Sequence, residues 1–158
     1  LVTGVPDSAL KGLSDYLDFQ DIIEHIKVPS EGISLSYSAG YYMAKKKPAL
    51  IYLQNSGLGN IINPLTSLMD KLVYSIPCVI LVGWRAYKGQ KDEPQHKKMG
   101  LVSKDLVVAM GYDCIELNSN SDWKKCLKNS FDLANSSKSP LKMVNMQPRL
   151  HCQRMMMF

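Results

Sequence analysis

The sequence predicts an α/β fold: an open, mostly parallel sheet of about six strands with helices on both faces. Two observations lead to this prediction. The runs PALIYLQ (48–54) and PCVILVGW (77–84) are almost wholly apolar, and strands buried on both faces are typical of parallel sheets. Segments suited to helices separate the apolar runs, and this alternation indicates parallel strands joined by helical crossovers.

The strands are short apolar runs bounded by polar or turn-forming residues, and they are predicted at 1–5, 22–28, 48–54, 77–84, 113–117 and 140–144. Helices fill the intervals, at 6–17, 31–46, 61–74, 97–110 and 122–134. Pro6 and Pro64 fall in predicted first turns, where proline is tolerated. Ser30 is placed to cap the helix that begins at Glu31.

The length and composition fit one globular domain. The chain has 158 residues, 46% of them hydrophobic and 21% charged, which is enough to bury a full core. No second domain is indicated, so we expect one domain over 1–144 and a divergent, disordered tail over 145–158.

The charge pattern indicates which kinds of partner this chain can bind. The formal net charge of +5 is scattered over the chain, without the aromatic interleaving of a nucleic-acid surface, so we expect no nucleic-acid partner. A small anionic substrate suits this balance. There is no apolar run long enough for a membrane span and no secretory leader, so we expect a cytoplasmic protein with no membrane contact.

The four cysteines show no CxxC spacing. We therefore expect Cys78 and Cys114 to be buried, reduced thiols, and we expect no metal site in this chain.

Ligands of open parallel sheets bind beyond the carboxyl ends of the strands. Four polar or glycine-rich segments fall at such ends: 4–8, 29–32, 54–60 and 84–96. In the third, QNSGLGN, the pattern GxG lacks the third glycine of a dinucleotide fingerprint and the GK[ST] of a P-loop, so neither site is predicted. A tight turn that needs glycine would look the same.

Each of the other three segments also allows two interpretations. KDEPQH (91–96) is either a solvated charged loop or a site containing Asp92, Glu93 and His96. In GVPDS (4–8), Asp7 and Ser8 face a ligand or simply cap a helix. Glu31 opens a helix with no other charge until Lys45, and it either complements the helix dipole or has a chemical role.

Taken together, several segments resemble the phosphonopyruvate decarboxylase family, which are thiamine-diphosphate-dependent 2-keto-acid decarboxylases. The segments are GVPDSALKGL, VPSEGISLSYSAGYYMA, IYLQNSGLGNIINPLTSL, YSIPCVILVGWR, KGQKDEPQHKKMG and GYDCIEL. The resemblance covers about residues 3–144 and implies the pyrimidine-binding domain of these enzymes. Ala86 stands where the family pattern has glycine.

The resemblance implies a role for each candidate residue. Glu31 would be catalytic, because a glutamate in this position hydrogen-bonds N1' of the aminopyrimidine ring and so helps to activate the cofactor. His96 would be the other catalytic residue, and Arg85, Lys91 and His96 are candidates for contact with the phosphonate or the carboxylate or for proton transfer. Glu31 would also bind the cofactor, together with Gln54, Asn55, Gly57 and Gly59. The substrate-binding residues would be Asp7, Ser8, Arg85 and Lys91.

The resemblance further implies decarboxylation of 3-phosphonopyruvate to phosphonoacetaldehyde and CO2, a step of phosphonate biosynthesis. The GDG…N motif that holds Mg2+ and the diphosphate is not found in this sequence. We therefore expect a fragment or a subunit that is inactive without a diphosphate-binding domain, supplied by a homo-oligomer or by a second chain. The alternatives are a sulfopyruvate decarboxylase alpha subunit and a non-catalytic binding or regulatory domain.

Overall fold

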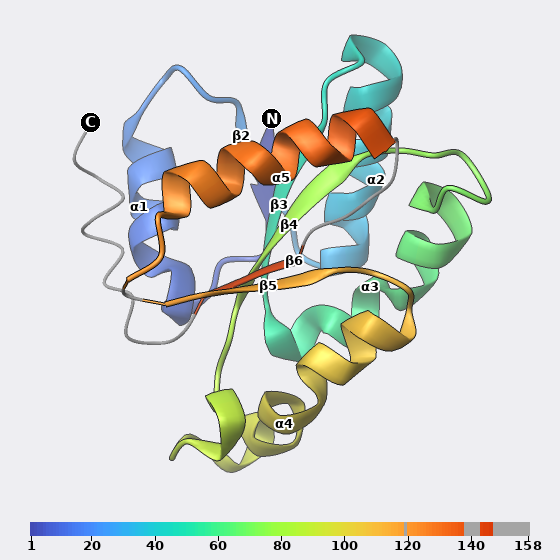
Figure 1. Ribbon diagram of the computed structural model, residues 1–158. Helices are drawn as coiled ribbons and strands as arrows, with labels where there is room; N and C mark the ends of the chain where they lie inside the picture. Colours follow the sequence, from blue (N-terminus) through green and yellow to red (C-terminus); the bar gives the residue numbers. More distant parts are fainter. Residues whose placement is uncertain (119, 138–142, 147–158) are drawn as a thin grey trace.

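The computed structural model describes residues 1–118, 120–137 and 143–146. Within them lies a six-stranded sheet in the order β2-β1-β3-β4-β6-β5, and every neighbouring pair is parallel. The strands are β1 (Val2–Gly4), β2 (His25–Lys27), β3 (Ala49–Gln54), β4 (Cys78–Gly83), β5 (Cys114–Leu117) and β6 (Met143–Met146). The predicted parallel sheet is confirmed (Figure 1).

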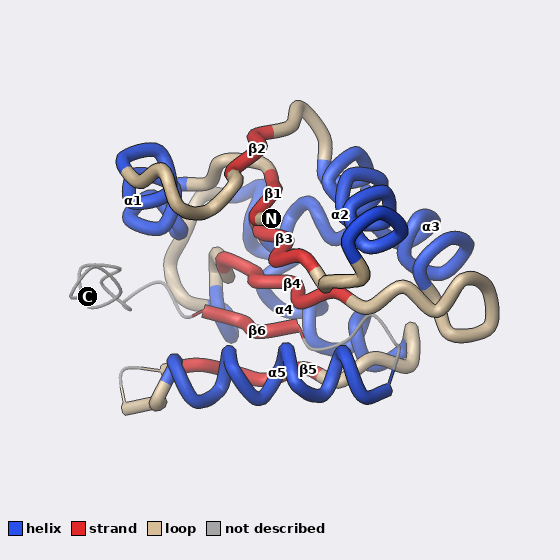
Figure 2. The backbone as a smooth tube through the Cα atoms, turned by 90° about the horizontal axis from the view of Figure 1, so that it is seen from above, coloured by secondary structure: helices blue, strands red, loops and turns tan. Residues whose placement is uncertain are grey.

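Helices cover both faces, as predicted. They are α1 (Lys11–Phe19), α2 (Glu31–Lys45), α3 (Leu58–Pro64), α4 (Pro94–Ala109) and α5 (Trp123–Ser137). In Figure 2, α1 lies on one side of the sheet and α2 and α3 lie on the other. The core clusters place the remaining helices: one cluster contains residues of α1 and α5, and the other contains residues of α2, α3 and α4.

The centre of the sheet is formed by β3 and β4, which pair along their whole length from Ala49 opposite Cys78 to Gln54 opposite Gly83. All of β4 is buried, and in β3 only Gln54 is partly exposed. Burial on both faces explains why these strands are continuous apolar runs.

The first helical segment differs from the prediction for 6–17. A 3-10 turn at Ser8–Leu10 comes first, and α1 then continues to Phe19. The Asp7 carboxylate caps the turn by accepting a hydrogen bond from the amide of Ala9 at 3.0 Å. Asp7 is therefore an N-cap. Its other carboxylate oxygen also accepts a hydrogen bond from Gln54.

The helix predicted over 61–74 begins and ends earlier. The glycine-rich segment itself is helical, as a 3-10 turn at Asn55–Gly57 that runs into α3. Pro64 is the last residue of α3 rather than part of a first turn, and a π-helical segment, Leu65–Met69, follows. Asp70 ends the helix because its carboxylate accepts from the amide of Leu72 at 2.8 Å, which closes a turn.

The remaining boundaries shift in smaller ways. The helix predicted from 97 begins at Pro94, in the favoured first position, and α5 runs to Ser137 instead of 134. Ser30 occupies the cap position of α2 but makes no side-chain capping hydrogen bond, so that part of the prediction was wrong.

The strand predicted over 22–28 is reduced to His25–Lys27. The Gln20 side chain accepts from the amides of Ile22 and Ile23 at 2.9 and 2.6 Å and so holds a turn in place of a strand. In consequence Ile22 is 94% exposed although it is apolar.

At the other end of the chain, β6 is Met143–Met146, while residues 140–142 of the strand predicted over 140–144 lie outside the described residues. Two residues assigned to the tail are thus part of the sheet. The rest of the predicted disordered tail, 147–158, lies outside the described residues.

Cys78 and Cys114 were both predicted to be buried. Cys78 is fully buried, which raises the pKa of its thiol to about 12. Cys114 is only half-buried, so its prediction was partly wrong. No helix in the part of the chain that the structure describes is long and apolar enough to cross a membrane.

Candidate functional site

Three of the predicted polar segments meet beyond the carboxyl ends of β1, β3 and β4. Gln54 at the end of β3 donates from Nε2 to the carboxylate of Asp7, which follows β1. Arg85, just after β4, donates from Nη1 to the hydroxyl of Ser8 at 3.0 Å. Because these strands are parallel neighbours, residues up to 77 positions apart share one edge of the sheet.

Glu31 lies beside the glycine turn. It begins α2, is partly buried, and its Oε2 accepts a hydrogen bond from Nδ2 of Asn60 at 2.8 Å. A Cβ on Gly57 would lie 2.5 Å from the carboxyl carbon of Glu31, so this position accepts only glycine while the carboxylate keeps its place. A Cβ on Gly59 would meet nothing within 4 Å.

This arrangement provides a carboxylate acceptor at the rim of the glycine turn, with open space over Gly59. An aminopyrimidine ring offers an amino donor, ring nitrogens that can share a proton with a carboxyl group, and a flat face. A glutamate carboxyl group can make such a bond, and backbone without side chains lets a ring approach closely. The residues present therefore fit the pyrimidine end of thiamine diphosphate.

Asp7 is a second carboxylate at this edge and is 8% exposed. One of its oxygens caps the 3-10 turn, and the other accepts from Gln54. A Cβ on Gly83 would lie 2.5 Å from Oδ2 of Asp7, so β4 must end in glycine for Asp7 to fit. The hydroxyl of Ser56 donates to Oε1 of Gln54 and completes the chain of contacts.

Arg85 forms a two-point pair with Asp92. Nε and Nη2 of Arg85 donate to the two carboxylate oxygens at 2.9 and 2.6 Å. This pairing holds the pKa of Asp92 well below its usual range and raises that of Arg85. Both side chains are therefore charged at neutral pH.

Asn55 contacts the backbone of Arg85 on both sides. Its Oδ1 accepts from the Arg85 amide at 3.0 Å, and its Nδ2 donates to the Arg85 carbonyl at 3.2 Å and to Ser103 Oγ at 3.1 Å. Asn55 is 0% exposed. Its side chain thus faces inward, which differs from the cofactor contact that the resemblance implies for it.

Two features define the loop after Arg85: the backbone conformation of Ala86 and the contact of Tyr87 with Glu116. Ala86 adopts a left-handed conformation with φ of 51°, which explains why a glycine, free to adopt it, would suit this position. The Tyr87 hydroxyl donates to Glu116 at 2.6 Å, and Lys104 also donates to Glu116 at 2.9 Å. These contacts lower the pKa of Glu116 to about 2, so it is ionised at neutral pH.

The last two predicted site residues, His96 and Lys91, have no side-chain hydrogen bond or ion pair with the charged residues of the site in the described part of the chain. His96 lies in the first turn of α4 and is partly buried, and its buried Nδ1 has no hydrogen-bond partner among the residues that the structure describes. Lys91 is exposed. Among the described residues, no hydrogen bond or ion pair joins either of them to Glu31 or Arg85.

Asn60, Asp92 and Ser103 also contact this edge. The sequence offered Asp92 in one of the two interpretations of KDEPQH, but the resemblance assigned no role to Asp92, Asn60 or Ser103. Nothing in the sequence pointed to Ser103. In the described ranges, no group of three or more His, Cys, Asp or Glu side chains could hold a metal ion.

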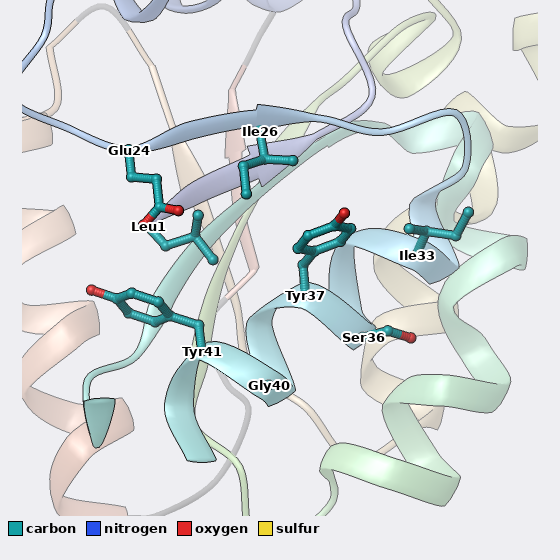
Figure 3. Close-up of a pocket in the computed structure, with 8 residues that line it drawn as sticks. All are labelled: Leu1, Glu24, Ile26, Ile33, Ser36, Tyr37, Gly40 and Tyr41. Atoms are coloured by element: carbon teal, nitrogen blue, oxygen red, sulfur yellow. The ribbon is translucent and has the colours of Figure 1, made fainter. Parts of the chain in front are cut away.

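A separate pocket of about 460 Å³ lies between β2 and α2. Figure 3 shows Tyr37 and Tyr41 on the helix beside this space, with Leu1, Glu24 and Ile26 across from them. None of the predicted site residues lines it. It is an apolar groove distinct from the edge that carries Glu31 and Arg85.

The likeness to known proteins agrees with this geometry. Residues 1–105 match the family model described as "Thiamine pyrophosphate enzyme, N-terminal TPP binding domain". A phosphonopyruvate decarboxylase of Streptomyces hygroscopicus is 37% identical over 132 residues, which are 84% of this chain but 31% of that protein. The chain thus spans less than a third of the length of this relative.

Two further matches extend the comparison. A sulfopyruvate decarboxylase subunit alpha of Methanococcus maripaludis is 32% identical over 140 residues, 89% of this chain and 81% of that subunit. The crystal structure of benzoylformate decarboxylase from Polynucleobacter necessarius superposes with a TM-score of 0.72 at 16% identity, over 93% of this chain and 27% of that one. The chain belongs to the thiamine pyrophosphate enzyme family and carries its N-terminal TPP-binding domain.

Proposed function

We propose that this chain supplies the aminopyrimidine-binding half of a decarboxylase that converts 3-phosphonopyruvate to phosphonoacetaldehyde and CO2. The observation that carries the proposal is the placement of Glu31, held by Asn60 over Gly57, on the same sheet edge as Arg85. A carboxylate at the rim of the glycine turn and a paired arginine on the same sheet edge suit a cofactor-dependent reaction of an anionic acid.

Each residue has a distinct part in this proposal. Thiamine diphosphate, when bound, supplies the carbon nucleophile and the electron sink for decarboxylation. Glu31 holds a proton at the aminopyrimidine ring, while Gly57, Gly59 and Gln54 form the turn that receives the ring. Arg85, with Ser8 and Asp7 beside it, receives an acid group of the substrate, and Lys91 and His96 act from the loop and the start of α4.

The diphosphate and Mg2+ would be held by a diphosphate-binding domain of a partner, either a second copy of a longer chain or a separate subunit. The alpha-subunit naming of the Methanococcus maripaludis relative supports a separate partner.

A second candidate is the alpha subunit of a sulfopyruvate decarboxylase. It is favoured by the extent of the match, because the chain covers 81% of that relative but 31% of the phosphonopyruvate decarboxylase. The two acids have the same 2-keto carboxylate and differ in the second acid group, so relative kcat/KM for the two substrates decides between them.

The experiment is a CO2-release assay of the chain combined with a diphosphate-binding domain of the family, with thiamine diphosphate and Mg2+ present. We expect wild type to release CO2 and Glu31→Gln to lose about 100-fold or more of the rate, a typical loss for general acid–base groups. Glu24→Gln, at an exposed glutamate, is the matched control and should keep the wild-type rate.

Two outcomes would contradict the proposal. Equal rates for wild type and Glu31→Gln would remove Glu31 from the chemistry. Stable association of the two proteins with no CO2 release from either acid would favour a non-catalytic binding or regulatory domain.

A further inference from the structure

Asp92 is the most heavily hydrogen-bonded carboxylate at the functional edge described above. One oxygen accepts from Nη2 of Arg85 at 2.6 Å and from the amide of Glu93 at 2.8 Å. The other accepts from Nε of Arg85 and from the amide of Ala86, both at 2.9 Å. Its side chain is 12% exposed, so four donors fix this carboxylate in a largely enclosed place.

This carboxylate determines where the Arg85 guanidinium points. A two-point pair fixes both the plane and the rotation of a guanidinium, unlike a single contact. Asn55 holds the Arg85 backbone at the other end of the side chain. Asp92 does not engage Nη1 of Arg85, and this nitrogen donates to the hydroxyl of Ser8 at the same sheet edge.

We propose that Asp92 is a positioning residue that aims the Nη1 edge of Arg85 at an acid group of the 2-keto acid substrate. The inference rests on the proposed function, because it takes Arg85 as the group that receives the acid. Arginine has many rotamers, and an arginine held in its binding orientation before the substrate arrives does not lose that freedom on binding.

The charge of Asp92 also acts against anion binding, so the direction in which Asp92→Asn changes binding distinguishes the two effects. A carboxylate beside Arg85 reduces the positive field that attracts an anion. If that effect were the larger one, removing the charge of Asp92 would tighten anion binding. Positioning requires that Asp92→Asn weaken it.

The experiment measures binding of 3-phosphonopropionate to the full chain by NMR titration. This probe carries both acid groups but no 2-keto group, so binding is separated from turnover. The variants are Asp92→Asn, Arg85→Lys and the double variant. Asp15→Asn, at an exposed residue paired with Lys11 on α1, is the control for the same change in net charge.

We expect Asp92→Asn to weaken binding about tenfold when Arg85 is present and less than twofold in the Arg85→Lys background. Such non-additivity shows that Asp92 acts through Arg85. Asp15→Asn should bind as wild type does. The Nε–Hε resonance of Arg85 should also move in Asp92→Asn, because its partner at 2.9 Å has changed.

Three results would overturn the inference: tighter binding by Asp92→Asn, equal losses in both backgrounds, or no binding by wild type. Its failure is distinguishable from failure of the proposed function. CO2 release by wild type without the coupling overturns the positioning role alone. Coupled probe binding without CO2 release in the reconstituted assay overturns the proposed reaction alone.

Discussion

Asn60 donates a hydrogen bond from Nδ2 to Oε2 of Glu31 at 2.8 Å, although 29 positions separate the two residues. Glu31 starts α2 and Asn60 lies in α3, so packing of the two helices on one face of the sheet makes this contact. The bond holds one carboxylate oxygen and thereby sets the direction of the other.

Asn60→Ala should therefore reduce the rate of CO2 release without unfolding the protein. We expect about a tenfold loss of kcat in the reconstituted assay, the lower end of what a lost charged hydrogen bond causes. The free energy of unfolding should change by less than about 0.5 kcal/mol, because Asn60 is exposed. An unchanged kcat would show that Glu31 needs no support from Asn60.

The glycine turn offers a matched pair of substitutions. Gly57→Ala would place a methyl group against the Glu31 carboxyl, and we expect it to lower the free energy of unfolding by about 1 kcal/mol. Gly59→Ala adds a methyl group in open space within α3, and it should raise stability by about 0.5–1 kcal/mol.

Chemical denaturation of both alanine variants measures the difference. In a Glu31→Ala background the cost of Gly57→Ala should disappear, because the overlapping carboxyl is gone. The same cost with and without Glu31 would mean that the backbone, not the carboxylate, requires glycine at position 57.

Asn55 is the buried link between the glycine turn, Arg85 and α4. Removing it leaves the Arg85 amide and carbonyl without their side-chain partner, so Asn55→Ala should cost about 2–3 kcal/mol in the free energy of unfolding. Asn129→Ala, at an exposed position of α5, should change it by less than about 0.5 kcal/mol. Urea titrations of the two variants test this, and similar midpoints would refute the structural role.

His25 makes stability depend on pH. Burial lowers the pKa of His25 below its ordinary value of 6.5, while Asp18 opposes this shift. The folded protein thus favours neutral His25, and its Nε2 contacts the hydroxyl of Tyr52 at 2.9 Å. A lowered histidine pKa gives stability that is present above pH 6.5 and is lost as the pH falls through the lowered pKa.

The free energy of unfolding measured at pH 7.5 and 5.5 tests this sign. We expect wild type to lose more stability over that interval than His25→Gln, which cannot bind the proton. An equal loss in both proteins would assign the pH dependence to other groups.

Much of the architecture followed from local sequence patterns. Continuous apolar runs predicted β3 and β4 because only strands covered on both faces bury every residue. Strand–helix alternation predicted the parallel sheet, and parallel strands bring their carboxyl ends to one edge. The segments that contain Asp7, Gln54 and Arg85 were therefore expected to meet, and they do.

Sequence patterns were enough to predict which segments form the sheet and which residue types gather at its functional edge. That Asn55 turns inward to Arg85 and that Asn60 holds Glu31 follows only from the folded arrangement. These outcomes depend on strand order and helix packing, which join residues far apart in the chain. Local patterns record burial and turns, but a contact between distant side chains exists only once the strands have taken their order in the sheet.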